Sequence, residues 1–227
     1  MAGKTSGAMT TDTLPEVGSA RTPAQASAGS GAGAAASRCG AIVLTRHGEP
    51  ALSRKILLTA QGYRDWWAKY EEGGLLQGQT PPPCLLETAQ NAGVVFSSTR
   101  QRARETAAAV AGEGKAVAEV LFIEAPLPPP NAPNWFKLSP RWWGVVARAW
   151  WWFFDHNEGQ ETRAEAQVRA GKAADLLERT ACEGKDVLVL AHGFFNGMVG
   201  VELARRGWRC TRDKGFKYWS ARKFEKA

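Results

Sequence analysis

Short apolar runs alternate with amphipathic segments along most of the chain, from about residue 41 to residue 224. Continuous apolar runs of this length are typical of buried strands, whereas apolar residues three and four apart indicate helices. Strands are predicted at 41–46, 94–97, 117–123, 186–190 and 218–224, and helices at 59–72, 100–111, 161–180 and 194–206. Thr59 is a suitable N-cap for the first helix, and Gly73 and Gly74 end it. The alternation predicts an α/β fold: a three-layer sandwich in one domain, with a mostly parallel sheet and helices on both faces.

Residues 1–38 lack this alternation and consist mainly of Ala, Gly, Ser and Thr. Such a segment cannot bury enough apolar surface to offset the entropy of ordering it, so a flexible tail is predicted, followed by a folded domain over 39–227. A transit peptide is the alternative, although those peptides are richer in Arg and poorer in acidic residues. The proline-rich stretches 77–83 and 125–134 are predicted to be a linker and a loop.

The composition is that of a globular protein, because 44% hydrophobic and 22% charged residues exclude wholesale disorder, collagen and coiled coil. The four cysteines are scattered without a CxxC pair, which excludes a disulfide scaffold or zinc ribbon and fits a reducing compartment; these are Cys39, Cys84, Cys182 and Cys210. We expect them to be buried small hydrophobes in a cytoplasmic protein. Three histidines leave little material for a metal site, so no metal is expected, and the net charge of +7 suits an anionic ligand.

Polar residues suited to catalysis follow several predicted strands. His47, in Arg46-His47-Gly48-Glu49, comes where the first strand ends, and His192 follows the fourth strand directly before a helix. Arg102 lies just past the second strand, and Glu124 lies just past the third. Ligands of open α/β sheets bind at the carboxyl ends of the strands, and the N-terminus of a helix attracts anions. We therefore expect these side chains to form one anion-binding pocket.

The residue types in this pocket suit phosphoryl transfer. A phosphoryl group in transfer spreads negative charge over three oxygens, which Arg46 and Arg102 can bind with their planar guanidinium groups. A neutral imidazole is a competent nucleophile near neutral pH, and a carboxyl group can protonate the departing alkoxide. These roles are assigned to His47 as nucleophile, His192 as hydrogen-bond donor to the phosphoryl oxygens and Glu124 as general acid.

The motifs also carry a resemblance to a known family. Arg46-His47-Gly48, Arg102-Ala103-Arg104-Glu105-Thr106 and Ala191-His192-Gly193, with Leu58-Thr59-Ala60-Gln61-Gly62 at the first helix, resemble the histidine phosphatase superfamily, which has the phosphoglycerate-mutase-like fold. The resemblance runs from about Ala41 to Phe224. It implies a phosphohistidine on His47, a phosphate pocket of Arg46, Arg102 and His192, and no cofactor. The acid varies in position within this family, and Glu49, beside the nucleophile, competes with Glu124 for the role.

Two departures from the family pattern favour a phosphatase over a mutase. Many mutases and related phosphatases have an Asn six residues after the nucleophile, where this chain has Ser53 followed by Arg54, and the usual aromatic and Asn pattern of the mutases in that loop is also absent. The expected activity is hydrolysis of a small-molecule phosphomonoester through the phosphohistidine. A phosphomutase of the same fold is the first alternative, and a low-activity phosphate-binding or membrane-surface protein is the second.

A tryptophan-rich segment at 135–154 lies within a predicted cap insertion at about 125–160. Taken as a helix from Pro140, it places Arg141, Gly144 and Arg148 on one narrow face and aromatic residues on most of the rest. A lid over the pocket is favoured, with Arg141 or Arg148 reaching a second anionic group of the substrate. Interfacial membrane attachment and a dimer contact are the alternatives. No nucleic-acid partner is expected, because no RNA- or DNA-binding motif accompanies the tryptophans.

Overall fold

The computed structural model describes residues 38–227, so the tail predicted over 1–38 lies outside the described residues except for Arg38. The strands are β1 (Ile42–Arg46), β2 (Val94–Ser98), β3 (Val117–Glu119), β4 (Val187–Ala191), β5 (Trp208–Asp213) and β6 (Ala221–Lys226). They form one sheet in the order β3-β2-β4-β1-β6-β5. The first four strands in this order are parallel, and β6 and β5 are added antiparallel. The predicted α/β fold with a mostly parallel sheet is therefore confirmed.

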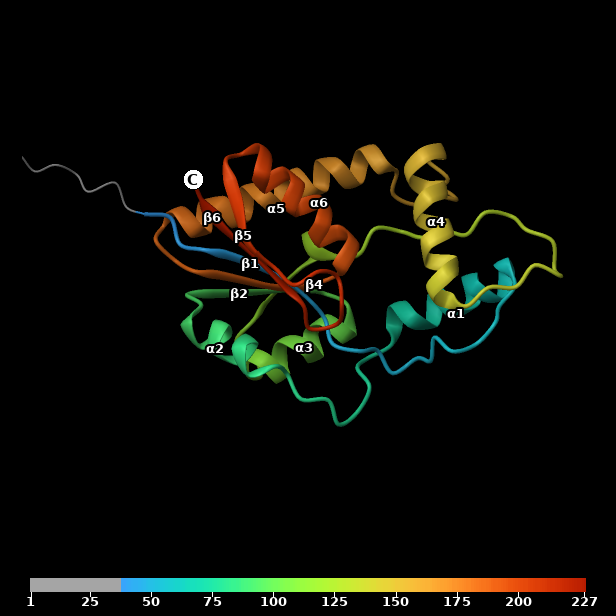
Figure 1. Ribbon diagram of the computed structural model, residues 1–227, viewed down its shortest axis with the longest axis horizontal. Coiled ribbons are helices and arrows are strands. Elements are labelled where there is room, and N and C mark those ends of the chain that lie inside the picture. The colour runs from blue at the N-terminus through green and yellow to red at the C-terminus, as the bar shows by residue number, and fades with distance from the viewer. Residues whose placement is uncertain (1–37) are drawn as a thin grey trace, which may run out of the picture. The chain divides into compact units, whose positions relative to one another are not determined.

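The helices are α1 (Ala60–Glu72), α2 (Pro83–Asn91), α3 (Gln101–Ala111), α4 (Pro140–Phe154), α5 (Arg163–Cys182) and α6 (Gly193–Arg205), with a 3₁₀ turn at Val120–Phe122. Helices α5 and α6 cover one face of the sheet and α2 and α3 cover the other, as Figure 1 shows. Alternate residues of each central strand supply the two cores: in β1, Ile42 and Leu44 face α5 and α6, whereas Val43 faces α2. Burial on both faces explains why these strands are continuous apolar runs.

Several boundaries differ from the sequence-based prediction. Helix α2 was not predicted, because the prolines before it suggested only a linker; Pro83 instead occupies the first helical turn, where proline is tolerated. Strand β3 is shorter than predicted because the chain turns into the 3₁₀ helix at Val120. Strand β5 was missed, since only Trp208 of its residues is buried and the pattern is polar. The predicted N-cap at Thr59 is confirmed: its side chain accepts a hydrogen bond from the Gly62 amide.

Helices α1 and α4 pack against each other beyond the end of the sheet, around a third core. This core is aromatic and includes Tyr63, Trp66, Tyr70 and Trp143. The helix predicted from Pro140 is confirmed as α4. Its segment is also hydrogen-bonded to the chain before α1, because the amide and carbonyl groups of Leu58 and Leu138 bond each other at 2.8 and 3.0 Å.

The expectation that the cysteines are buried small hydrophobes is wrong. Cys39 and Cys182 form a disulfide that ties the segment before β1 to the last residue of α5, and their Cα atoms lie 4.0 Å apart. The two cysteines meet because β1 pairs with β4, which follows α5 directly. Cys84 and Cys210 are exposed free thiols. The expectation of a reducing compartment depended on unpaired cysteines, so this pair removes its support.

Breaking the disulfide should destabilise the fold. The bond closes a loop with a sequence separation of 143 residues, and Cys182→Ser is expected to lower the free energy of unfolding by about 2–4 kcal/mol. Urea unfolding with and without dithiothreitol measures the effect, and Cys210→Ser, at an exposed free thiol, is the matched control. Four titratable thiols in the untreated native protein would contradict the bond.

Candidate active site

The two strand-end histidines lie side by side. Strands β1 and β4 pair in register, with Arg46 opposite Ala191, so the residues that follow them, His47 and His192, emerge from the sheet together. The backbone amide of His47 donates to the Ala191 carbonyl at 2.9 Å, and the centroids of the two imidazole rings are 5.2 Å apart. Both side chains are buried. The pairing register of the sheet thus brings together two residues 145 positions apart in sequence.

The imidazole of His47 is held with one nitrogen free. Its Nδ1 lies 2.7 Å from the carbonyl oxygen of Gly48, and because a carbonyl only accepts, Nδ1 carries the proton and donates. Burial lowers the pKa of His47 well below 6.5, and the charges of Arg102 and Arg46 lower it further. The ring is therefore neutral at pH 7, and Nε2 carries the lone pair.

Gly48 is required by the tight packing of the turn after β1. A Cβ atom on this residue would lie 2.3 Å from the indole ring of Trp219. Its amide donates to the hydroxyl of Thr106 at 3.0 Å, and that hydroxyl donates in turn to the Arg102 carbonyl at 2.6 Å. The turn that carries His47 is thereby fixed to the start of α3, which carries Arg102.

The tautomer of His192 follows from its two partners. Its Nδ1 lies 3.4 Å from Nη2 of Arg102, which can only donate, so Nδ1 is the acceptor and Nε2 donates to the Ser98 hydroxyl at 2.9 Å. Burial lowers the pKa of His192 well below 6.5, with Arg102 as the next cause. Ser98, the last residue of β2, was not singled out in the sequence, and only its register beside β4 reveals its role.

Arg102 is held in place by the end of α1. It is fully buried, its Nη1 donates to the Tyr70 carbonyl at 2.8 Å, and its Nη2 pairs with the Glu71 carboxylate at 2.7 Å. The guanidinium also lies over the Tyr70 ring, 4.5 Å from the centroid. Glu71 pairs with Arg100 as well, at 2.8 Å. Nothing in the sequence linked Glu71 to the Arg102 motif, because the contact joins residues 31 positions apart.

A narrow cavity lined by four arginines opens beside His47. These come from β1, the following loop, α3 and α4, and are Arg46, Arg54, Arg102 and Arg148. The Nε atom of each is buried without a hydrogen-bond partner in the described part of the chain, as is the hydroxyl of Tyr63, which lines the same cavity. Unpaired buried donors are rare in folded proteins and call for an acceptor. The cavity has a volume of about 20 Å³, room for about one water molecule, so a phosphoryl group enters only if its lining moves.

Glu124 lies on the wall of this cavity, whereas Glu49 does not. One carboxylate oxygen of Glu124 accepts from the Phe195 amide at the start of α6, at 2.9 Å, and the other lies 3.9 Å from Nη2 of Arg148. Glu49 is exposed and does not line the cavity. Of the two candidate acids named from the sequence, the structure brings only Glu124 to His47.

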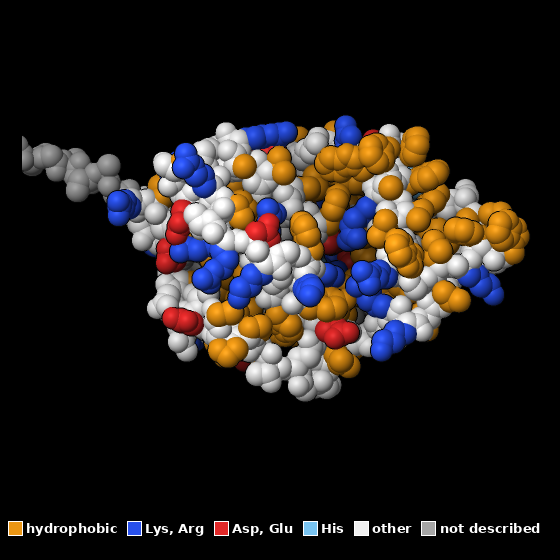
Figure 2. All heavy atoms as spheres, in the orientation of Figure 1, with side chains coloured by type: hydrophobic (Ala, Val, Ile, Leu, Met, Phe, Trp, Pro, Cys, Tyr) orange, Lys and Arg blue, Asp and Glu red, His pale blue; other side chains and the backbone are white. Residues whose placement is uncertain are grey.

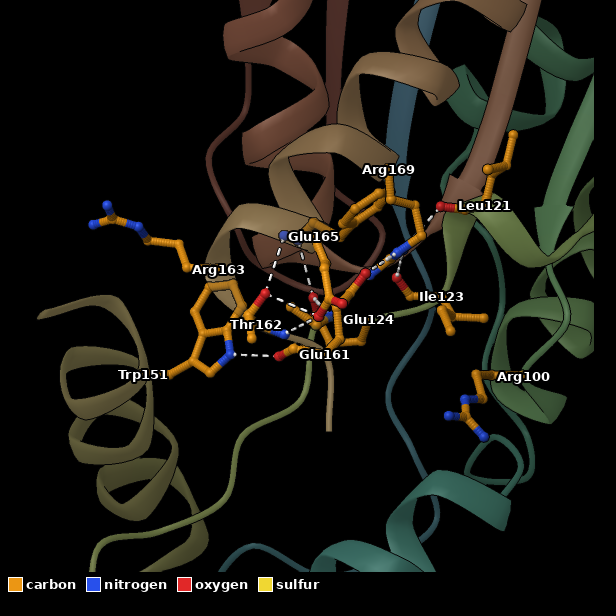
Figure 3. A network of polar contacts seen from close by, with 12 residues as sticks. Arg100, Leu121, Ile123, Glu124, Trp151, Glu161, Thr162, Arg163, Glu165 and Arg169 are labelled. Atoms are coloured by element: carbon orange, nitrogen blue, oxygen red, sulfur yellow. Dashed lines mark hydrogen bonds and ion pairs between the residues drawn. The ribbon is translucent and has the colours of Figure 1, made fainter. Parts of the chain in front are cut away.

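An ion pair behind Glu124 fixes the loop that carries it. Arg169 of α5 donates to the carbonyls of Leu121 and Ile123, at 2.9 and 2.8 Å, and pairs with Glu161 at 2.7 Å (Figure 3). Glu124 follows immediately in the chain. Because Arg169 donates to the carbonyl groups of this turn, the position of Glu124 at the cavity is fixed.

A larger cavity of about 570 Å³ adjoins the narrow one and shares Trp67, Glu124 and Leu127 with it. The arginines around it are already paired: Arg64 with Glu158, Arg100 with Glu71 and Arg169 with Glu161. The rest of its lining includes Val120, Ile123 and a run of prolines. It can accommodate the uncharged part of a leaving group next to Glu124.

The aromatic wall from α1 was missed by the sequence analysis. Tyr63, Trp66, Trp67 and Tyr70 line the narrow cavity, and their spacing of three and four places them on one face of α1. This spacing is the feature of the sequence from which the aromatic wall could have been predicted. Arg54 was noted only as the neighbour of Ser53. Between residues 38 and 227, no group of three or more His, Cys, Asp or Glu side chains is placed to hold a metal ion.

The two buried histidines should make the fold sensitive to acid. In the unfolded chain they titrate near pH 6.5, whereas burial lowers the pKa of both in the folded state. Below about pH 6.5 the unfolded chain binds more protons than the folded one. The free energy of unfolding therefore decreases as the pH is lowered, by up to about 2.7 kcal/mol per pH unit for two groups, and these groups make it independent of pH above about pH 6.5. Urea unfolding between about pH 5 and about pH 8 measures this slope. An unchanged slope after both histidines are replaced would contradict this origin.

Comparison with known proteins identifies a family for most of the chain. Residues 42–208 match the family model of the histidine phosphatase superfamily (branch 1). The comparison with curated proteins gave no match.

Among solved structures, the chain is similar to a phosphoglycerate mutase from Bacillus anthracis str. Sterne, at 19% identity over 76% of this chain and 83% of that one, with a TM-score of 0.46. It is also similar to a phosphoserine phosphatase from Entamoeba histolytica in complex with phosphoserine, at 17% identity over 73% and 80%, with a TM-score of 0.45. A mycobacterial glucosyl-3-phosphoglycerate phosphatase gives 17% identity over 73% and 80%, with a TM-score of 0.46. Likeness at this level assigns no substrate to this chain.

Proposed function

Because the chain belongs to branch 1 of the histidine phosphatase superfamily, we propose that it is a metal-independent phosphatase that hydrolyses a phosphomonoester through a phosphohistidine on His47. The observation that carries this proposal is the state of His47. Its Nδ1–H is committed to the Gly48 carbonyl, so the lone pair of Nε2 belongs to a cavity lined by four arginines. A neutral nucleophile among fixed cations suits attack on a phosphate dianion.

In the first step, Nε2 of His47 attacks phosphorus and the ester P–O bond breaks. Arg46 and Arg102 bind the phosphoryl oxygens, whose charge is greatest in the transition state. The departing alkoxide takes a proton from Glu124, leaving a neutral alcohol, a carboxylate and the phosphohistidine. The larger cavity beside Glu124 is where the alcohol would lie.

In the second step, water replaces the alcohol. Glu124, now a carboxylate, takes a proton from the water as its oxygen attacks phosphorus, and the P–N bond breaks. Inorganic phosphate leaves, His47 is again neutral, and Glu124 is again protonated. His192 does not line the narrow cavity, and its Nδ1 faces Arg102, so it would donate to the phosphoryl group once Arg102 has turned to the phosphate and Nδ1 is protonated, which the phosphate's negative charge favours.

The cavity has more cationic groups than one phosphate requires. With Arg46 and Arg102 on the phosphoryl group, the unpartnered Nε atoms of Arg54 and Arg148 and the Tyr63 hydroxyl are left over. Arg148 and Tyr63 meet at Gly144, where a Cβ atom would lie 3.6 Å from each. We infer that the substrate carries a second anionic group, such as a carboxylate, bound by Arg54 and Arg148.

Arg148→Ala tests this second contact. It is expected to raise KM by about tenfold for a phosphomonoester that also bears a carboxylate, because one charge-assisted hydrogen bond is lost. The KM for p-nitrophenyl phosphate, which has no second anion, should not change. Arg141→Ala, at an exposed position on the same helix, is the matched control. Equal effects of Arg148→Ala on both substrates would contradict a second-anion site.

A single-turnover trap tests the proposed function. The protein is mixed with ³²P-labelled phosphoserine or 3-phosphoglycerate in the presence of EDTA, quenched, and assayed for protein-bound label. Label that is lost in acid and retained in base is expected, since phosphohistidine has that stability. Released inorganic phosphate distinguishes a phosphatase from a phosphomutase, which would return an isomer of the substrate. Absence of label and of turnover across a panel of phosphomonoesters would contradict both.

A further inference from the structure

Helix α4 has two different faces. Its inner face is buried and includes Trp143, Gly144, Ala147 and Trp151, at spacings of one, three and four. Trp142, Val145 and Phe153 lie on the opposite, outer face and are exposed, and Trp150 and Phe154, three and seven residues after Ala147, are also exposed toward the C-terminal end of the helix. The inner face completes the third core and the wall of the narrow cavity, and it buries enough apolar surface to hold α4 against the rest of the fold. Trp142 and Phe153 are 59% and 76% exposed, so burial in a core does not account for them within the described part of the chain.

The outer face belongs to a wider apolar surface. The loop before α4 adds Trp135, which is 80% exposed, and the loop before α1 adds Leu57, which is 69% exposed. The two loops are joined by the Leu58–Leu138 hydrogen bonds. Figure 2 shows hydrophobic side chains gathered over α4 and its preceding loop, with Lys and Arg side chains beside them. This aromatic surface consists of Leu57, Trp135, Trp142, Val145, Trp150, Phe153 and Phe154.

The two segments that build the aromatic surface are basic, although the exposed Asp155 follows Phe154 directly. These segments, residues 51–64 and 125–154, contain no Asp or Glu and six Lys or Arg residues. Lys137 and Arg141 are exposed among the aromatic residues and form no ion pair within the described part of the chain. Acidic residues are frequent elsewhere, so the segregation is local. Such a surface suits a partner that has an anionic outer layer over an apolar interior.

We propose that this aromatic surface binds the surface of a bilayer that contains anionic lipids. Tryptophan and phenylalanine insert at the boundary of headgroups and acyl chains, while neighbouring Lys and Arg attract anionic headgroups. No helix in residues 38–227 is long and apolar enough to cross a bilayer, so the contact is peripheral. The sequence favoured a lid, with membrane attachment as an alternative for the same segment. In the structure the buried residues and Trp142, Val145 and Phe153 fall on opposite faces of α4.

Vesicle co-sedimentation of the full chain tests this proposal. The expected result is binding to phosphatidylcholine vesicles that contain phosphatidylserine, at least tenfold stronger than to phosphatidylcholine alone and weakened by high salt. The charge variant Lys137→Glu/Arg141→Glu should lose more than about fivefold per position. Its matched control is Lys172→Glu/Arg179→Glu, at exposed positions on α5. The aromatic variant Trp142→Ala/Phe153→Ala should lose binding, whereas Val120→Ala/Val168→Ala, which also alters exposed hydrophobic residues, should not.

Three further readouts decide the interpretation. Unchanged thermal unfolding of the variants shows that lost binding is not lost folding. His47→Ala should bind vesicles as the wild type does, so the surface is tested independently of the proposed phosphatase activity. Equal binding by the aromatic variant and the wild type, or no binding to phosphatidylserine vesicles, overturns the proposal. A dimer by light scattering that Trp142→Ala/Phe153→Ala converts to a monomer also overturns it, since a second copy would then cover this surface.

Discussion

His47→Ala is expected to lower kcat by about 10⁴-fold or more, because the covalent route loses its nucleophile. The only other buried histidine in the described structure, His192, cannot replace it. Its Nε2 donates to Ser98 and its Nδ1 faces Arg102, so neither nitrogen presents a free lone pair to the substrate. Residual turnover would have to come from water activated by Glu124 alone.

Initial-rate assays with a phosphomonoester that the wild type hydrolyses measure this loss. His156→Ala is the matched control, since this third histidine lies outside the cavity, beside Glu158. The variant should also give no acid-labile label in the single-turnover trap. Turnover within tenfold of the wild type would exclude a phosphohistidine and place the nucleophile on another group.

The fold was predictable because its central strands are buried on both faces. Such strands are apolar throughout, and the helices between them begin and end with the residues that favour those positions, such as Thr59 and Gly73. The elements that were missed lie where this logic fails. Strand β5 is exposed and polar, and α2 begins with a proline that suggested a loop. The disulfide was missed because nothing local marks a pair of cysteines 143 residues apart.

The candidate site was predictable only in part, for a related reason. Residues at strand ends are adjacent in space once the strand order is known, so His47, His192, Arg102 and Glu124 could be placed together. Glu71 reaches Arg102 from the end of a helix that is not next to the sheet, and no periodicity encodes that contact. Motif position thus predicts the groups that are proposed here to act on a phosphate. It does not predict the groups that hold them or bind the rest of the substrate.

The double-faced α4 connects the site with its surroundings. The helix supplies Arg148 to the cavity from its inner side and the aromatic surface from its outer side. The narrow cavity has room for about one water molecule, so substrate entry requires a movement of its lining, which includes α4. The proposed membrane contact and the proposed second-anion contact would thus lie on one helix.

Arg102→Lys is expected to lower kcat/KM by about 10²- to 10³-fold, because lysine keeps the charge and loses the planar fork that binds two phosphoryl oxygens. Replacement by alanine would be less informative. It would leave a void at a fully buried position and remove one of the two arginines that pair with Glu71, and so lower the free energy of unfolding by about 3 kcal/mol. The lysine variant limits this structural loss and isolates recognition of the phosphate.

Arg104→Ala is the matched control, because Arg104 lies two residues further on α3 and is exposed. It should leave kcat/KM and urea unfolding unchanged. Inorganic phosphate should protect the wild type against thermal unfolding and protect Arg102→Lys less, which separates phosphate binding from catalysis. If Arg102→Lys keeps full activity and phosphate protection, then Arg102 serves only to join α1 to α3 through Glu71. The phosphate would in that case be held by Arg46 with Arg54 and Arg148, the remaining arginines of the cavity.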